Sequence, residues 1–118
     1  MRQARAAGDV GRYADMFAAM GAAPRLRIMR LLLAAHPRGL VVGEIQAGLE
    51  MAPSTLSHHL DKLKMEDLVT VAREGTFLRY RANDVALRQL LAFFYAECCS
   101  GTGIVAPAQV ARAIRSPR

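Results

Sequence analysis

The chain has 118 residues, of which 53% are hydrophobic and 22% are charged. This length predicts one folded domain, and the hydrophobic content excludes a largely disordered chain. The net charge of +6 favours a polyanionic partner, with nucleic acid first among the candidates.

Signals for a membrane or for secretion are missing. No apolar run is long enough to span a bilayer, and the basic residues near Met1 are not followed by the apolar stretch of a secretory signal. The two cysteines, Cys98 and Cys99, are neighbours, so they do not make the framework of a disulfide-rich fold. We therefore expect a cytoplasmic protein without membrane attachment, in a reduced compartment where the thiols are available for chemistry.

The first predicted helix follows residues 1–11, which we expect to be a frayed and flexible lead. Its apolar side chains recur at three- and four-residue intervals, the spacing of one helix face: Tyr13, Met16, Phe17 and Met20. Gly21 ends this helix. Pro24 then fits the first turn of a second helix, where its missing N–H costs nothing.

The second helix carries a wide apolar stripe that we expect to be buried. The stripe consists of Leu26, Ile28, Met29, Leu32 and Leu33. The arginines between these positions are expected to face outward: Arg25, Arg27 and Arg30. The turn-forming residues 36–39 end the helix.

A compact unit of two short helices comes next. Residues 42–49 predict the first of them, residues 50–52 a tight turn, and Pro53 the start of the second. The second helix has leucines on one side, namely Leu56, Leu60 and Leu63. Its other side is polar, with Ser57, His58, Asp61, Lys62 and Lys64. Two short helices with such a polar outer face on the second are what a helix-turn-helix requires.

The period of the pattern then changes to that of strands. Residues 68–73 and 76–82 are rich in β-branched or aromatic side chains, and Glu74-Gly75 separates them. A hairpin this small is only marginally stable alone, so we expect it to lie against the helices. Asn83-Asp84 offers an N-cap for a last helix that is apolar nearly all round as far as Tyr95. The surplus apolar face implies a second copy across a two-fold axis.

The order of these elements predicts a mainly α fold with a small β-hairpin. It is that of a winged helix-turn-helix, dimerising through its first and last helices. Residues 12–99 form this DNA-binding and dimerisation domain. Residues 100–118 form a basic tail rich in Gly, Ala and Pro, in which residues 108–114 have a weak helical pattern.

DNA contacts are expected at the start of the second helix of the helix-turn-helix, because such a helix enters the major groove with its N-terminal residues nearest the bases. The candidates there are Ser54, Thr55, Ser57 and His58, whose hydroxyl and imidazole groups can bond bases or phosphates. In the hairpin, Arg73 and Arg79 are expected to reach the adjacent minor groove or its phosphates. Two alternatives stay open: Ser54 as a simple helix cap, and the arginines as solvated charges. A dimeric reader predicts a double-stranded operator that is an imperfect inverted repeat.

Three segments carry a family resemblance. Residues 22–32 read Ala-Ala-Pro-Arg-Leu-Arg-Ile-Met-Arg-Leu-Leu, residues 54–63 read Ser-Thr-Leu-Ser-His-His-Leu-Asp-Lys-Leu, and residues 73–81 form the hairpin. In this order and spacing they resemble the second helix, the recognition helix and the wing of the ArsR/SmtB family of repressors. The resemblance implies a homodimeric transcriptional repressor, not an enzyme, that releases its operator when an effector binds.

Two metal sites of that family are missing here. Val41 and Gly43 stand where one group of members has a Cys-x-Cys pair, and residues 84–97 contain no histidine for a zinc site. Cys98 and Cys99 remain, and they resemble the metalloid site of the arsenic-responsive members. The resemblance therefore implies a trivalent effector, As(III) or Sb(III), which suits soft thiolates.

The metalloid site of such members has three sulfurs, and this chain has no third cysteine. The partner protomer or a small thiol supplies the third sulfur, or the effector is an organoarsenical that needs only two, or part of the site has been lost.

Three other interpretations of the cysteines stay open. The pair can be small buried hydrophobes, or the thiols of a redox- or persulfide-sensing repressor of the same fold. A thiol-dependent enzyme, with Cys98 as nucleophile and a histidine as base, belongs to a different class. No Cys-x-x-Cys, phosphate loop or paired-carboxylate motif accompanies the pair, so catalysis is not expected. No obligatory cofactor is expected either.

Overall fold

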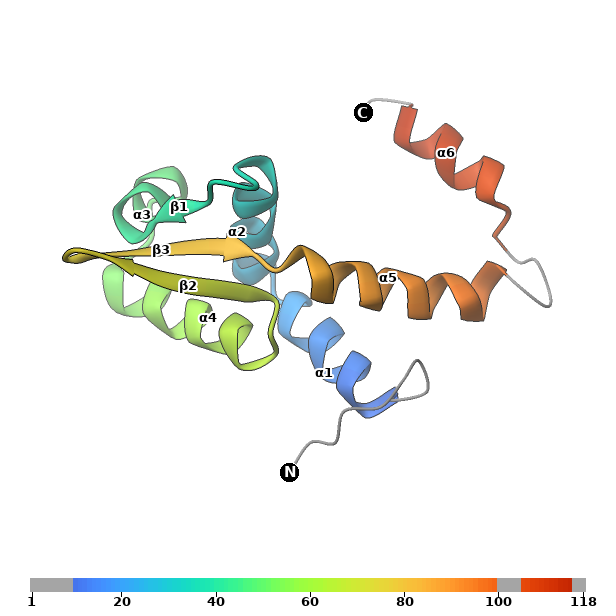
Figure 1. Cartoon of the computed structure of the whole chain (residues 1–118), viewed down its shortest axis with the longest axis horizontal. Coiled ribbons are helices and arrows are strands. Elements are labelled where there is room, and N and C mark those ends of the chain that lie inside the picture. Colours follow the sequence, from blue (N-terminus) through green and yellow to red (C-terminus); the bar gives the residue numbers. More distant parts are fainter. Residues whose placement is uncertain (1–9, 100–104, 116–118) are drawn as a thin grey trace.

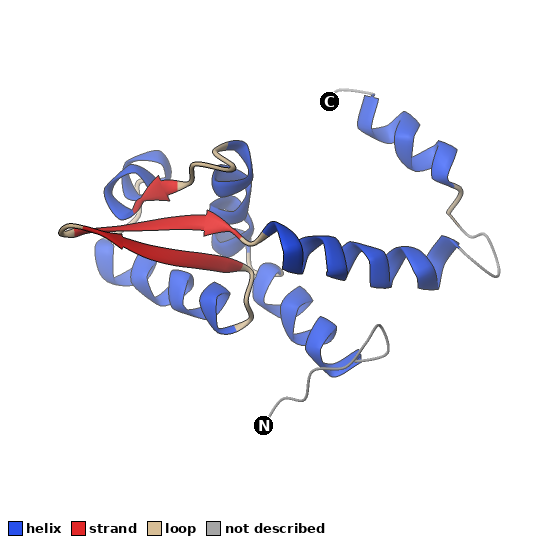
Figure 2. Cartoon of the chain, viewed as in Figure 1, coloured by secondary structure: helices blue, strands red, loops and turns tan. Residues whose placement is uncertain are grey.

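The computed structural model describes residues 10–99 and 105–115, and within them the chain is mainly α-helical with a small sheet (Figure 2). The elements in chain order are α1 (Val10–Met20), α2 (Ala23–Ala34), β1 (Leu40–Val41), α3 (Val42–Leu49), α4 (Pro53–Met65), β2 (Val69–Glu74), β3 (Phe77–Ala82), α5 (Asp84–Cys99) and α6 (Pro107–Arg115). The predicted winged helix-turn-helix is confirmed, with α3 and α4 as the helix-turn-helix and β2–β3 as the wing. The first helix begins at Val10, inside the stretch that was expected to be a lead.

The sheet has three strands where the sequence predicted two, because a two-residue strand is added at one edge. The strand order is β1-β3-β2 and both pairs are antiparallel, with Leu40 opposite Tyr80 and Val69 opposite Ala82. Gly39 makes the extra pair possible. Its φ is +78°, and a Cβ at this position would collide with the main-chain oxygen of Tyr80. Two residues are too few to show the alternation by which a strand is predicted.

The core lies between helices α1, α2 and α4 and the sheet. Figure 1 shows α4 running along β2. Helices α1 and α5 lie at the end of the sheet opposite the tip of the β2–β3 hairpin. The largest fully buried side chains are Met16, Ile28, Met29, Leu32, Ile45, Leu56, Leu60, Leu63, Leu68 and Leu90. This set confirms the predicted leucine face of α4.

The buried face of α2 differs from the predicted one. Ile28, Met29 and Leu32 are buried, but Leu26 and Leu33 are 50% and 51% exposed. Successive residues turn about 100° around a helix, so the three buried side chains share one face with Arg25, which precedes Ile28 by three residues. The prediction that Arg25 faces outward is therefore wrong, and its side chain is half-buried. A helix that is apolar on several sides does not itself indicate which side faces the core.

Helix α5 begins at the predicted cap. The side-chain oxygen of Asn83 accepts a hydrogen bond from the main-chain nitrogen of Ala86 at 3.2 Å. The helix then runs beside α1, where the rings of Tyr13 and Phe93 are stacked with 4.5 Å between their centroids. Helix α6 begins near the far end of α5 and turns back above it in the view of Figure 1, and it contains the residues with the weak helical pattern. In the described parts of the chain, no helix is both long and apolar enough to cross a membrane.

Candidate nucleic-acid interface

The polar face of α4 is exposed. It carries all four residues of the helix that were predicted to contact DNA: Ser54, Thr55, Ser57 and His58. On the opposite side the three leucines of α4 are at most 1% exposed. The helix is thus held by its leucines while hydroxyls and an imidazole face solvent, which is the geometry that a groove-reading helix needs.

The first turn of α4 also presents main-chain donors. Ala52 is the N-cap, with extended backbone and without a side-chain cap, and Pro53 is the first helical residue. Ser54 is therefore the second residue of the helix, and the alternative interpretation of Ser54 as its cap is wrong. The N–H groups of this turn, together with the hydroxyls of Ser54 and Thr55, can donate to a phosphate.

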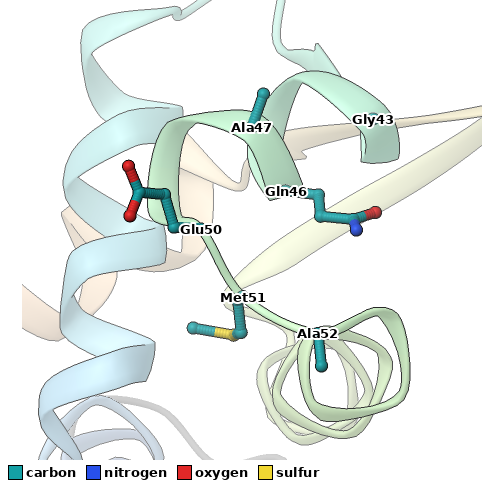
Figure 3. A pocket seen from close by; sticks show the side chains of 6 residues that line it. All are labelled: Gly43, Gln46, Ala47, Glu50, Met51 and Ala52. Carbon is teal, nitrogen blue, oxygen red and sulfur yellow. The ribbon is translucent and has the colours of Figure 1, made fainter.

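A hollow of about 560 Å³ lies between α3 and the start of α4 (Figure 3). Its lining residues are Gly43, Gln46, Ala47, Glu50, Met51 and Ala52. The amide of Gln46 points outward on the side where Ala52 leads into α4, whereas Glu50 points the other way (Figure 3). A glutamine amide both donates and accepts, and glutamine side chains can therefore make two hydrogen bonds to an adenine. Gln46 is for this reason a further candidate for DNA contact. The sequence alone did not identify Gln46, because the apolar spacing that predicted α3 says nothing about its polar positions.

The two predicted arginines of the wing have different surroundings. Arg73 on β2 is exposed, whereas the side chain of Arg79 on β3 is only 13% exposed. Nε of Arg79 donates to Oε2 of Glu74 at 2.9 Å, and its Nη1 donates to the main-chain oxygen of Gly39 at 3.3 Å. Arg79 thus links Gly39, the residue before β1, to Glu74 near the tip of the wing. Both DNA contacts stay predictions, and Arg73 is the one whose guanidinium is open to solvent.

The adjacent histidines of α4 also differ. His58 is exposed, while His59 is half-buried with its Nδ1 3.3 Å from Nη1 of Arg25 on α2. Burial lowers the pKa of His59, and the charges of Arg25 and His58 lower it further. His59 is therefore neutral at pH 7 and is directed toward α2.

The predicted effector cysteines are the last two residues of α5. The side chains of Cys98 and Cys99 lie outside what the structure describes. Among the described side chains, no group of three or more His, Cys, Asp or Glu is placed to hold a metal ion. The metalloid site therefore stays a prediction.

An exposed apolar face follows α1, α5 and α6. Its members are Val10, Phe17, Leu91, Phe94, Tyr95, Val110 and Ile114, which are between 40% and 78% exposed. Phe17 and Phe94 join the first two helices, with 5.9 Å between ring centroids. A cavity of about 780 Å³ separates α5 from α6 and is lined mainly by apolar side chains, including Leu91 and Val110. The parts of this face on α1 and α5 belong to the two helices that were predicted to meet a second copy, whereas α6 was not part of that prediction.

Known proteins share this arrangement. Residues 24–71, from α2 into β2, match the model of a family described as bacterial regulatory protein, arsR family. An uncharacterised HTH-type transcriptional regulator of Methanocaldococcus jannaschii is 33% identical over 78 residues, which are 66% of this chain and 85% of the relative. The segment that matches the family model includes the whole of the helix-turn-helix, α3 and α4.

Two solved structures are also similar. One is the homodimeric winged helix-turn-helix DNA-binding domain of a possible ArsR-family transcriptional regulator from Mycobacterium bovis. It has 31% identity and a TM-score of 0.60, over 75% of this chain and 81% of that one. The other is reduced HlyU from Vibrio cholerae, with 27% identity and a TM-score of 0.60, over 76% of this chain and 92% of that one. The likeness covers most of the described fold in each case.

Proposed function

The chain belongs to the arsR family of bacterial regulatory proteins, and on this premise we propose that it is a homodimeric repressor that leaves its operator when a thiophilic metalloid binds Cys98 and Cys99. It is a DNA-binding transcriptional regulator by family. The observation that carries the repressor proposal is α4, whose leucines are buried while its serines, threonine and His58 face solvent. Repression, the inverted-repeat operator and the effector are the proposed parts.

The second copy is supported by the apolar face along α1, α5 and α6. Leu91, Phe94 and Tyr95 are all exposed on α5. Exposed apolar side chains that cluster in this way mark an interaction surface more often than a bare surface of a monomer. The similar domain from Mycobacterium bovis is homodimeric. A two-fold pair would carry two α4 helices, which would read half-sites about 10 bp apart or a multiple of that.

The metalloid part is supported by the place of the cysteines at the end of α5. Thiolates favour soft trivalent arsenic and antimony, and each thiol would lose its proton to a hydroxide ligand that leaves the metalloid as water. Neighbouring side chains on a helix point about 100° apart, so both sulfurs reach one atom only if the last turn of α5 unwinds. Unwinding beside the dimer face would change the spacing of the two α4 helices and release the DNA.

A thiol redox or persulfide sensor of the same fold is the second candidate. It is favoured by the adjacent thiols and by the likeness to HlyU, which was solved in a form described as reduced. Oxidation of the pair, rather than chelation, would then release the operator.

The experiment begins by selecting duplexes from a random pool with the full-length protein. An inverted repeat, bound with an affinity that falls steeply with salt, is the expected result, because displaced counterions cause that dependence. No selected duplex, or binding that ignores salt, would overturn the DNA-binding part.

The selected duplex is then titrated with arsenite, antimonite, methylarsenite, zinc, cadmium and peroxide. We expect the trivalent arsenic and antimony species to release the duplex from the wild-type protein. The Cys98→Ser/Cys99→Ser protein should bind DNA as the wild type does and ignore them. Release by peroxide alone would favour the redox sensor, and release that survives in the double variant would overturn both candidates.

A further inference from the structure

Arg25 touches two other helices from the inward face of α2. Its Nε donates to the main-chain oxygen of Ala19, in the last turn of α1, and its Nη1 is 3.3 Å from Nδ1 of His59 on α4. Helix α1 belongs to the apolar face described above, and α4 is the helix that would read DNA. One side chain therefore joins the dimer side of the molecule to its DNA side.

The chemistry of this contact fixes the state of His59. A guanidinium has only donors, so Nδ1 of His59 must be the acceptor, and the ring proton lies on Nε2. A protonated His59 would turn an N–H toward Arg25 and would lose the hydrogen bond while adding repulsion. The lowered pKa of His59 favours the neutral ring, and so the contact, at neutral pH.

Other charged groups surround the pair. His58 is the neighbouring ring on α4, with 5.6 Å between the ring centroids of the two histidines. A hollow of about 190 Å³ beside Arg25 is lined by three charged groups: Asp15 of α1, Lys62 of α4, and Glu66, which follows α4. These side chains set the local field around the Arg25 guanidinium, which contacts the Ala19 oxygen and His59.

We propose that Arg25 is a positioning residue that holds α4 against the end of α1 through neutral His59, so that operator affinity depends on this contact and falls when His59 is protonated. The inference rests on the operator binding proposed above. A helix whose orientation is already fixed loses less freedom when it docks in a groove, and a looser α4 must be ordered by the DNA at a cost in affinity.

The first test compares two arginines of α2. Arg25→Gln removes the guanidinium that makes both contacts and shortens the side chain, while Arg27→Gln removes the same charge from an exposed position. At pH 7.5 and fixed salt, Arg25→Gln should bind the selected duplex about 3- to 10-fold more weakly than Arg27→Gln, the range expected for the loss of one or two hydrogen bonds. Circular dichroism shows whether both variants are folded at the assay temperature. Equal affinities of the two folded variants would overturn the inference.

The second test uses the acceptor atom itself. His59→Asn keeps an oxygen near the position of Nδ1 and cannot titrate, whereas His59→Leu has no acceptor. We expect His59→Asn to bind more tightly than His59→Leu. Equal binding by the two would contradict a role for the acceptor.

The third test is a pH profile in a His58→Asn background, because protonation of His58 beside DNA would strengthen binding and mask the effect. Affinity should fall from pH 7.5 to 5.5 in the single variant and stay level in His58→Asn/His59→Asn. A fall that persists in the double variant overturns the inference. Failure of the wild type to bind any duplex would be a different result, since it would overturn the proposed function together with this inference.

Discussion

Two regions of the molecule differ in the exposure of most of their large apolar side chains. In the winged core, residues 23–82, the side chains that anchor the helix-turn-helix, such as Ile45 and Leu60, are at most 1% exposed. In the helical arm, residues 84–99 and 105–115, Leu91 and Phe94 are 65% and 53% exposed. The winged core therefore completes its DNA-facing surface within one chain, whereas the helical arm needs a surface from outside it. Stability should depend on the first region and assembly on the second.

The same substitution in the two regions gives the largest contrast. Leu60→Ala should lower the free energy of unfolding by about 2–5 kcal/mol, because it leaves a cavity in the core. Leu91→Ala should change it by less than about 0.5 kcal/mol at a protein concentration where the chain is monomeric. Urea unfolding followed by circular dichroism over a range of concentrations measures both. Equal losses in dilute protein would break the distinction between the regions.

The dimer face gives the next effect. Phe94→Asp places a charge where the second copy would pack, and it should weaken the dimer about 100-fold, or roughly 3 kcal/mol. Phe77→Asp is the matched control, since Phe77 is 61% exposed at the wing and lies outside the proposed face. Sedimentation velocity measures the monomer–dimer equilibrium. If Phe94→Asp and the control have the same dimer dissociation constant, the interface does not include Phe94.

Within the winged core, the buried side of α4 was more predictable than that of α2. Leucines at 56, 60 and 63 mark the inner face of α4 because its other positions are polar, so periodicity alone selects the side. In α2 the same method placed Leu26 and Leu33 inside and Arg25 outside, since apolar residues occur on several sides of that helix. The choice was made by packing against α1 and α4, which a single helix does not encode.

Local signals predicted some parts of the site and left others open. Hydroxyls and an imidazole at the start of a helix indicated Ser54, Thr55, Ser57 and His58, and all four are exposed. The roles of Arg79 and Arg25 depend on partners far along the chain, Gly39 and His59 respectively. No local sequence pattern predicts these two roles. The same holds for Gln46, which lies beside the start of α4 only after the tight turn has formed.

The joint between the two regions gives a smaller effect. Asn83 caps α5 through Ala86 and also donates from Nδ2 to the main-chain oxygen of Asp67 at 2.8 Å. Asn83→Ala should therefore lower the free energy of unfolding by about 1 kcal/mol. Gln89→Ala, at an exposed position of α5, should leave it nearly unchanged. If the two variants unfold alike, the cap does not couple the helical arm to the winged core.

The smallest effect is expected at the first turn of the helical arm. Oδ2 of Asp84 accepts a hydrogen bond from Nη1 of Arg88 at 2.7 Å, and this bond is the main cause of the lowered pKa of Asp84. A carboxyl whose pKa is lower in the folded chain stabilises the fold above its unfolded pKa, and that contribution is lost as the pH falls through the folded pKa. The wild type should therefore lose slightly more stability than Asp84→Asn between about pH 5 and pH 3. The pair is exposed, so salt should reduce the difference.

A double-mutant cycle with Asp84→Asn and Arg88→Ala assigns the effect. The pH-dependent difference should disappear once Arg88 is replaced, because its hydrogen bond is the first cause of the shift. A difference that survives without Arg88 would point instead to the other causes of the lowered pKa, which are a backbone hydrogen bond at the start of α5 and the charge of His36. In the former case the first turn of α5 would be stabilised through its backbone N–H groups, one of which already bonds to the side chain of Asn83. The ion pair would in either case not be the source of the pH-dependent stability.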